Sequence, residues 1–380
     1  MNWKNIVGQE NIKFFFNNAV RDKRLGNSYC FFGIEGVGKF AAALGIISST
    51  SCLKPKEIDG FLEACQECDN CKSIGNLKFP NVEYIFSLPA GKASDKEEGG
   101  LYASLSDSLI EDINLKLLQK IANPYAKFQI EGATQIKIAQ IRELRKNLSL
   151  SNSLPGRKFV VIFNAEEMNI DAQNAFLKTL EEPRDDITFL LLTTRREGLL
   201  PTILSRCQSV FFPPLSTDEI FNSLSKEYSI SAEELAIISR FANGSLTRAY
   251  EFVETNLKEL RDKMVDFLRL ALRKELPGAT LAEQISMFVE KFDKRKAQMC
   301  LELLASWIRD AVMLIKAGDG GLLVNIDDNA TLSRFAEKFV RKPLVEVIDI
   351  IENSIYMINS NVQIPTVYLN LFLEIRKVLL

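Results

Sequence analysis

Short uninterrupted runs of apolar residues recur in the first half of the chain, with amphipathic stretches between them. Apolar runs of this length are typical of strands buried on both faces of a parallel sheet, and apolar residues spaced by three or four predict helices. Strands are expected at residues 28–32, 82–86, 159–163, 189–194 and 210–212. Helices are expected at residues 3–26, 40–49, 106–121, 136–150, 172–182 and 199–204. The alternation predicts an α/β fold with a parallel sheet flanked by helices.

The pattern changes after the proline pair at 213–214, and the rest of the chain reads as helical. Capping boxes that begin at Ser216 and Ser231 predict two helix starts. Apolar stripes at helical spacing then continue nearly to the last residue, and they indicate core and subunit contacts. We therefore expect an α/β core at 1–214, a small helical lid at 215–256 and an all-α domain at 257–380.

A glycine-rich stretch follows the first expected strand and precedes a helix of small residues. Gly33, Gly38 and Lys39 have the spacing of a P-loop, but Phe40 stands where that motif has Ser or Thr. In a P-loop the backbone N–H groups and the lysine bind phosphates, and the hydroxyl holds Mg²⁺. The strand–loop–helix setting favours a P-loop over a plain turn. The candidate nucleotide-binding residues are Gly33, Gly36, Gly38 and Lys39, with the Mg²⁺ ligand missing.

Four cysteines lie close together at Cys52, Cys65, Cys68 and Cys71. Four thiolates at such spacings can close a tetrahedral Zn²⁺ site, which has no open position and is therefore structural. Four reduced surface thiols are the alternative. The remaining cysteines stand among apolar residues and are expected to be core thiols: Cys30, Cys207 and Cys300.

Composition narrows the chemistry further. The 380 residues contain no histidine, which excludes histidine bases, histidine triads and histidine metal ligands. A net charge of −2 provides no global attraction to nucleic acid. The sequence shows neither a signal peptide nor a membrane-length apolar run, so we expect a cytoplasmic protein.

Five short stretches of the sequence, called boxes below, support a resemblance to a known family. They are residues 6–10, 33–39, 174–183, 200–207 and 244–249. In order and spacing the chain resembles the AAA+ clamp-loader family of bacterial DNA polymerase III, and within it the delta-prime group. The cysteine cluster stands where members of this family carry a zinc module. The segment at about 90–130 has no match.

The resemblance implies a role in DNA replication. The family implies an AAA+ core with a zinc-module insertion, here at about 50–75, followed by a helical lid and a helical collar. The implied partners are the other clamp-loader subunits in a hetero-pentameric ring, the sliding clamp and primer–template DNA, with no membrane. The ring opens the sliding clamp and closes it on primed DNA.

Departures from the family pattern bear on catalysis. ATP-hydrolysing members have two acidic residues at the end of the third core strand, whereas alignment places Phe163 and Asn164 there. Together with Phe40, these residues remove the expected metal ligands and the water-activating base. A shifted alignment would assign the acidic role to Glu166 or Glu167, although a solvated position at the start of a helix explains these two residues better. We expect a subunit of the polymerase holoenzyme that is not catalytic by itself. Whether it binds ATP stays an open question.

Arg206 belongs to the Ser-Arg-Cys box, whose arginine in the family reaches the nucleotide site of the neighbouring subunit. The resemblance therefore implies that Arg206 is an arginine finger in trans, and a salt-bridged structural arginine is the alternative. Arg248 would be the second-sensor residue, which contacts this subunit's own nucleotide if one binds.

The leading hypothesis is a non-hydrolysing scaffold subunit of the clamp loader. An ATP-hydrolysing motor subunit of the gamma/tau type is the alternative, which Lys39 supports and Phe40 opposes. A separate P-loop kinase or repair ATPase, and a zinc-dependent DNA-binding module, fit the boxes less well.

Overall fold

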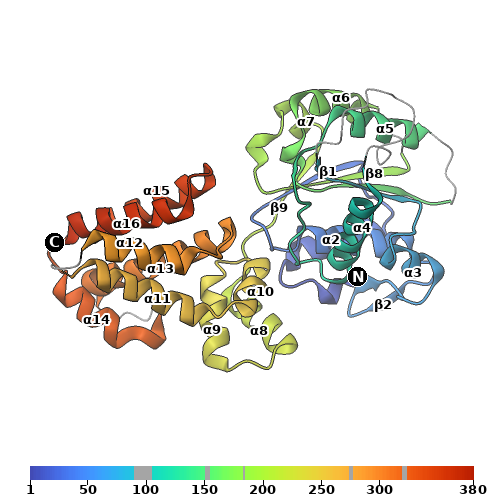
Figure 1. The fold of residues 1–380 in the computed structure, drawn as a ribbon. Coiled ribbons are helices and arrows are strands. Elements are labelled where there is room, and N and C mark those ends of the chain that lie inside the picture. The colour runs from blue at the N-terminus through green and yellow to red at the C-terminus, as the bar shows by residue number, and fades with distance from the viewer. Residues whose placement is uncertain (90–104, 150–154, 183–184, 274–276, 319–322) are drawn as a thin grey trace. The chain divides into compact units, whose positions relative to one another are not determined.

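A computed structural model describes residues 1–89, 105–149, 155–182, 185–273, 277–318 and 323–380 (Figure 1). Residues 90–104 of the unmatched segment and Pro183 of the box at 174–183 lie outside these ranges. The chain forms two compact units. The first unit comprises Met1–Tyr228 and Ala242–Tyr250, and the second comprises Ser229–Phe241 and Glu251–Leu380.

A parallel five-stranded sheet forms the centre of the first unit, in the order β4-β7-β8-β1-β9. Its strands are β1 (Ser28–Phe32), β4 (Val82–Ile85), β7 (Lys158–Ile162), β8 (Ile187–Thr193) and β9 (Gln208–Phe211). β8 is buried along its whole length between β7 and β1. Each strand overlaps one of the predicted apolar runs, and the predicted fold class is confirmed.

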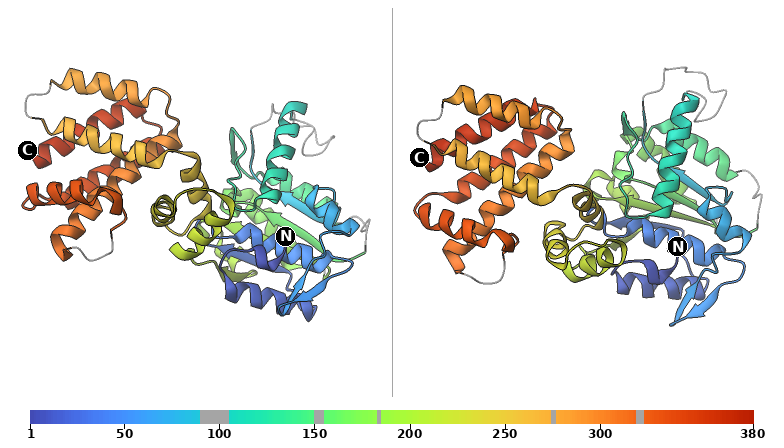
Figure 2. Two further views of the ribbon diagram at one scale, coloured as in Figure 1. Left: turned by 90° about the horizontal axis from the view of Figure 1, so that it is seen from below. Right: turned by 60° about the horizontal axis from the view of Figure 1, so that its bottom comes forward.

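Helices cover both faces of this sheet (Figures 1 and 2). The helices of the first unit are α1 (Glu10–Arg21), α2 (Lys39–Ser51), α3 (Asp69–Gly75), α4 (Asp107–Ala122), α5 (Ile138–Ser149), α6 (Ile170–Glu181), α7 (Pro201–Leu204) and α8 (Thr217–Glu227), with the 3-10 turns η1 (Trp3–Asn5), η2 (Ala165–Glu167) and η3 (Arg196–Gly198). Two short hairpins pair β2 (Lys56–Ile58) with β3 (Phe61–Glu63) and β5 (Leu88–Pro89) with β6 (Ala133–Gln135). Apolar residues of α5, α6 and α7 share one core cluster with β7 and β8.

The predicted helix at 3–26 is shorter in the structure and is preceded by a separate turn. Gly8 and Gln9 both have a φ of 60°, which interrupts the helix between η1 and α1. Trp3 is fully buried, and the Glu63 carboxylate accepts hydrogen bonds from the backbone N–H groups of Trp3 and Lys4 at 2.8 and 3.1 Å. A contact with the β2–β3 hairpin therefore fixes the start of the chain, and helical periodicity does not reveal such a contact.

The second unit is helical in its described residues. Its helices are α9 (Ala232–Phe241), α11 (Leu257–Ala271), α12 (Gly278–Val289), α13 (Lys294–Ala317), α14 (Asn329–Lys338), α15 (Leu344–Asn359) and α16 (Ile364–Leu379), with the turn η4 (Ile326–Asp328). α10 (Leu246–Glu254) begins in the first unit and ends in the second. α13 packs against α11, α14 and α15 around the buried Trp307. The division into domains at 214 and 256 stays a prediction.

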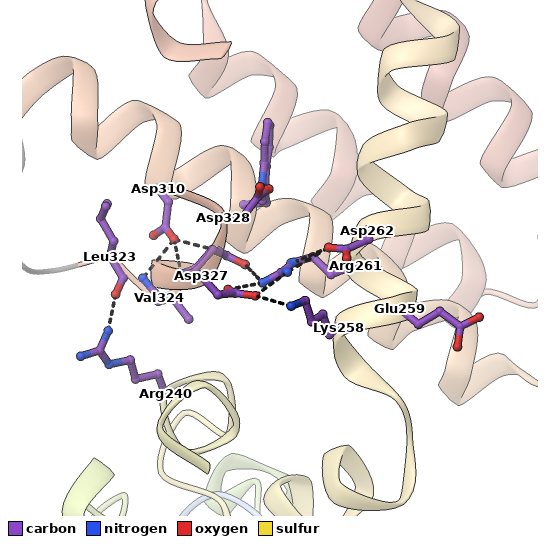
Figure 3. A network of polar contacts seen from close by, with 12 residues as sticks. Arg240, Lys258, Glu259, Arg261, Asp262, Asp310, Leu323, Val324, Asp327 and Asp328 are labelled. Atoms are coloured by element: carbon purple, nitrogen blue, oxygen red, sulfur yellow. Dashed lines mark hydrogen bonds and ion pairs between the residues drawn. The ribbon is translucent and has the colours of Figure 1, made fainter. Parts of the chain in front are cut away.

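A polar network anchors η4 to α11 and α13 (Figure 3). The Arg261 side chain is 1% exposed and donates to both carboxylate oxygens of Asp327, at 2.6 and 2.8 Å. Asp310 accepts from the backbone N–H groups of Val324 and Asn325 at 3.0 and 2.7 Å. Every described charge in this buried cluster therefore has a partner, as a low-dielectric interior requires.

Candidate functional site

The glycine-rich loop between β1 and α2 has the backbone of a P-loop. Gly33, Gly36 and Gly38 have φ values of 149°, 80° and 96°, a range that side chains with a Cβ disfavour. The loop thus turns its backbone toward the N-terminus of α2, as the sequence predicted. Lys39, the first residue of α2, is the candidate phosphate ligand.

Lys39 does not extend away from this loop. Its Nζ donates to the backbone oxygens of Gly33 and Ile34 at 2.6 and 2.7 Å. Burial lowers the pKa of Lys39 to about 8, although the carboxylates of Glu166 and Glu35 oppose that shift. The lysine therefore has hydrogen-bond partners within its own loop and is half-buried.

An aromatic cluster fills the position where a P-loop ATPase holds its metal. The ring of Phe40 lies 4.8 Å from that of Phe163, which lies 4.8 Å from that of Phe128, measured between centroids. Phe40 and Phe163 are 4% and 5% exposed. Mg²⁺ needs oxygen ligands in near-octahedral geometry, and these rings offer none. The residues present do not fit a Mg²⁺–ATP site of the usual kind.

The two acidic residues beyond β7 are bound to neighbouring loops. Glu166 Oε1 accepts from the N–H and the hydroxyl of Thr194 at 3.0 and 2.6 Å. Glu167 accepts from the Ser87 hydroxyl and, at 3.1 Å, from Asn164 Nδ2. Burial raises the pKa of Glu167. Both side chains are half-buried and line a cavity of about 250 Å³. Glu166 thus ties the end of β7 to the end of β8, and Glu167 ties it to the segment after β4.

Arg206 follows α7 and lies at the surface of the first unit. Its Nη2 donates to Glu181 Oε1 at 2.9 Å, and its Nη1 donates to the Thr202 carbonyl at 3.0 Å. The Arg206 and Glu181 side chains are 36% and 50% exposed. An ion pair this exposed contributes at most about 1 kcal/mol, so another anion can replace Glu181 at little cost.

The second arginine of the predicted site lies at the start of α10. Arg248 is half-buried, and its backbone N–H donates to Ser245 Oγ at 3.2 Å. Two residues earlier, the Leu246 N–H donates to the Gly36 carbonyl at 3.1 Å. The structure thus brings the start of α10 against the glycine-rich loop, whereas Arg206 belongs to the separate turn after α7.

The four clustered cysteines come together as predicted. The Sγ atoms of Cys52, Cys65, Cys68 and Cys71 all lie within 4.8 Å of one another. Tetrahedral Zn–S bonds of about 2.3 Å would place these sulfurs about 3.8 Å apart, so the cluster fits a zinc ion. The Cys65 and Cys68 N–H groups donate to neighbouring thiol sulfurs at 3.2 and 3.3 Å, which favours thiolate ligands.

The other three cysteines are buried, which confirms that they are core thiols: Cys30, Cys207 and Cys300. Within the described residues, no helix combines the length and the apolar character needed to cross a bilayer.

The order of the parallel sheet, the P-loop after its first strand and the helix start that contacts that loop agree with the predicted AAA+ fold. The chain belongs to the family described as DNA polymerase III, delta subunit, whose pattern matches residues 8–216.

Three relatives place the chain within replication proteins. It is 26% identical to the DNA polymerase III subunit delta' of Bacillus subtilis, over 99% of both chains. It is 33% identical to the delta' subunit of Pseudomonas aeruginosa, over 68% of this chain and 65% of that protein. The subunit tau of Bacillus subtilis is 25% identical over 93% of this chain, which spans 57% of tau.

Proposed function

We propose that this protein is a clamp-loader subunit of DNA polymerase III that hydrolyses no ATP itself and supplies Arg206 to the ATP of a neighbouring subunit. In this role it helps to open the sliding clamp and load it on primed DNA. One observation carries the proposal: the Phe40 and Phe163 rings, 4.8 Å apart, fill the metal position. The general base and the metal site are absent together, and loss of a base alone typically reduces turnover by about 10²–10⁴-fold.

Arg206 supports the second half of the proposal. Its guanidinium is permanently charged and planar, which suits it to phosphate oxygens in a neighbour's site. Its exposed bond to Glu181 is weak enough to exchange for a phosphate that carries more charge. An arginine supplied in trans can raise the rate of phosphoryl transfer by about 10³–10⁵-fold.

The proposal includes an architecture and a set of partners. Residues 1–214 would form the AAA+ core, 215–256 the lid and 257–380 the collar that joins the other loader subunits in a hetero-pentameric ring. The sliding clamp and primer–template DNA would be bound by the ring as a whole. The protein would act in the cytoplasm, as part of the replication machinery.

Zinc completes the proposal for the cysteine cluster. Thiolates from Cys52, Cys65, Cys68 and Cys71 would hold one structural Zn²⁺ with no position left for water. The ion would fix the end of α2 to α3. The same module holds the N-terminal segment through Glu63, whose carboxylate accepts from the backbone N–H groups of Trp3 and Lys4 in η1.

The proposed arginine finger is tested in the reconstituted loader ring. Arg206→Ala is expected to reduce clamp- and DNA-stimulated ATP turnover of the ring at least about tenfold. Arg21→Ala is the matched control, because Arg21 is also exposed and pairs with Glu57 at 3.8 Å. Equal turnover in the two variants would exclude the role of Arg206.

A motor subunit of the gamma/tau type is the second candidate. The relationship to tau and the intact Lys39 favour it. It requires Mg²⁺-dependent hydrolysis by the isolated chain that is abolished in Lys39→Ala. Absence of that activity in the wild type excludes it.

A further inference from the structure

A buried glutamine interrupts the apolar face of α6. Phe176 and Leu180 continue that face at helical spacing, whereas Gln173, which precedes them on it, is a polar residue that is only 4% exposed. An amide in this position loses its hydrogen bonds to water, so its burial costs free energy unless protein groups replace them. The partners of the Gln173 amide therefore indicate its role.

Both ends of the Gln173 amide have backbone partners. Its Nε2 donates to the Met168 carbonyl at 3.0 Å and to the Gly198 carbonyl at 3.1 Å. Its Oε1 accepts from the Leu200 N–H at 2.8 Å. Gly198 is the last residue of η3, and Leu200 directly precedes α7. The amide thus attaches the connection between η3 and α7 to the start of α6.

The segment that Gln173 holds leads directly to Arg206. The Leu200 carbonyl accepts from the N–H groups of Ile203 and Leu204 at 2.9 and 3.2 Å. The Ile203 carbonyl in turn accepts from the Arg206 N–H at 3.0 Å. A continuous series of hydrogen bonds therefore runs from the Gln173 amide through α7 to the backbone of the proposed arginine finger.

The helix α7 needs this support because it is short. It has four residues, and a single helical turn is unstable without tertiary contacts. Ile203 and Cys207 anchor it in the core, at 0% and 8% exposure. Apolar burial is non-directional, however, whereas hydrogen bonds fix orientation. The bonds from Gln173 therefore set the orientation in which α7 presents Arg206.

The other end of α6 contacts the same turn in a different way. Glu181, the last residue of α6, accepts from Arg206 Nη2 at 2.9 Å, and this ion pair is exposed. The guanidinium can therefore exchange Glu181 for another anion, while the backbone from which it extends stays fixed by the buried Gln173.

We infer that Gln173 is the positioning residue of the proposed arginine finger: its buried amide holds the start of α7 so that Arg206 is directed at the nucleotide of a neighbouring subunit. This inference deepens the proposed function and rests on it, because positioning has a consequence only if Arg206 acts. Misplacement of a group by about 1 Å can cost about 10²-fold in rate, so loss of the Gln173 bonds should slow the reaction without removing any group that contacts the nucleotide.

Gln173→Met tests the inference in the reconstituted loader ring. Methionine has a similar length but lacks the donors and the strong acceptor of the amide. We expect the maximal ATP turnover of the ring to fall at least about threefold, with KM for ATP unchanged. Gln140→Met is the matched control, because Gln140 is also 4% exposed and bonds to the backbone of Phe86 and Lys137 from the start of α5. Equal turnover in the two variants would overturn the inference.

The double variant separates positioning from a general loss of stability. If Gln173 acts through Arg206, adding Gln173→Met to Arg206→Ala should change ring turnover by less than about 1.5-fold. Full, independent effects of the two substitutions would overturn the inference. A ring that is indifferent to Arg206→Ala would refute the proposed function and this inference with it. Loss of turnover in Arg206→Ala beside wild-type turnover in Gln173→Met would refute the positioning role alone.

Hydrogen exchange of the isolated wild type provides a measurement that needs no variant. The Leu200 amide is expected to exchange at least about tenfold more slowly than in an unstructured chain, because it donates to Gln173. In Gln173→Met, exchange should become faster in residues 199–207, whereas Gln140→Met should leave it unchanged there. An unprotected Leu200 amide in the wild type would overturn the inference.

Discussion

Replacement of Phe163 tests whether aromatic packing has taken over the metal position. Its ring is 5% exposed and contacts Phe40 and Phe128, each at 4.8 Å between centroids. Removing a buried phenylalanine ring typically costs about 3–5 kcal/mol. A cavity of about 250 Å³ already borders Phe163, so water can enter part of the new void. We therefore expect Phe163→Ala to lower the free energy of unfolding by about 3 kcal/mol.

Urea denaturation of the full chain, followed by circular dichroism, measures this change. Phe211→Ala is the matched control, because Phe211 is 55% exposed on β9 and pairs with Phe32 at 5.3 Å. It should cost about 1 kcal/mol or less. Phe163→Asp restores the acidic residue of an ATPase, but it places a carboxylate among aromatic rings and should destabilise at least as much as Phe163→Ala. The reasoning is refuted if Mg²⁺ with ATP returns Phe163→Asp to wild-type stability.

Three further outcomes follow from the structure. Asp327→Ala should cost about 3 kcal/mol in urea denaturation at neutral pH, because it leaves the half-exposed Asp262 as the one described carboxylate that pairs with the buried Arg261. Burial alone would raise the pKa of Asp327, but hydrogen bonds from Arg261 lower it. This stabilisation is therefore present above about pH 4 and is lost as pH falls through the folded-state pKa. A urea midpoint of the wild type that does not fall on acidification would contradict the pairing. Cys71→Ser should release one zinc ion per chain in native mass spectrometry, and equal metal content in both proteins would remove the proposed site. Glu181→Gln should change the melting temperature by less than the equivalent of about 1 kcal/mol, since its bond to Arg206 is exposed, and a larger loss would indicate a structural pair.

The sheet could be predicted from sequence because its strands are buried on both faces. Such strands appear as unbroken apolar runs, and the run at β8 is buried at every position. The start of the chain could not be predicted in the same way. The apolar stripe of α1 indicated a helix from residue 3, whereas α1 begins only at Glu10, and the buried Trp3 instead donates its backbone N–H to the Glu63 carboxylate. These contacts join residues about 60 positions apart.

The candidate site also has features that the sequence predicted and features that it did not. Phe40 indicated the loss of one metal ligand because the P-loop pattern fixes the side chain at that position, and alignment with the family indicated the same for Phe163 and Asn164. The cysteine cluster was also predictable, since its spacing sets the geometry. The hydrogen bonds that Tyr125 accepts from Val7 and Thr247 could not be predicted, because residues 120–128 carry no motif and these contacts join positions about 120 residues apart.

The central claim is that this chain acts through Arg206 on a neighbour's ATP and hydrolyses none itself. ATP turnover by the isolated protein and by the reconstituted ring, with wild-type chain, Arg206→Ala and Arg21→Ala, tests it most directly. The account predicts no turnover by any isolated form, and a fall of at least about tenfold in the ring for Arg206→Ala alone. Hydrolysis by the isolated wild type, or a ring indifferent to Arg206→Ala, would contradict it.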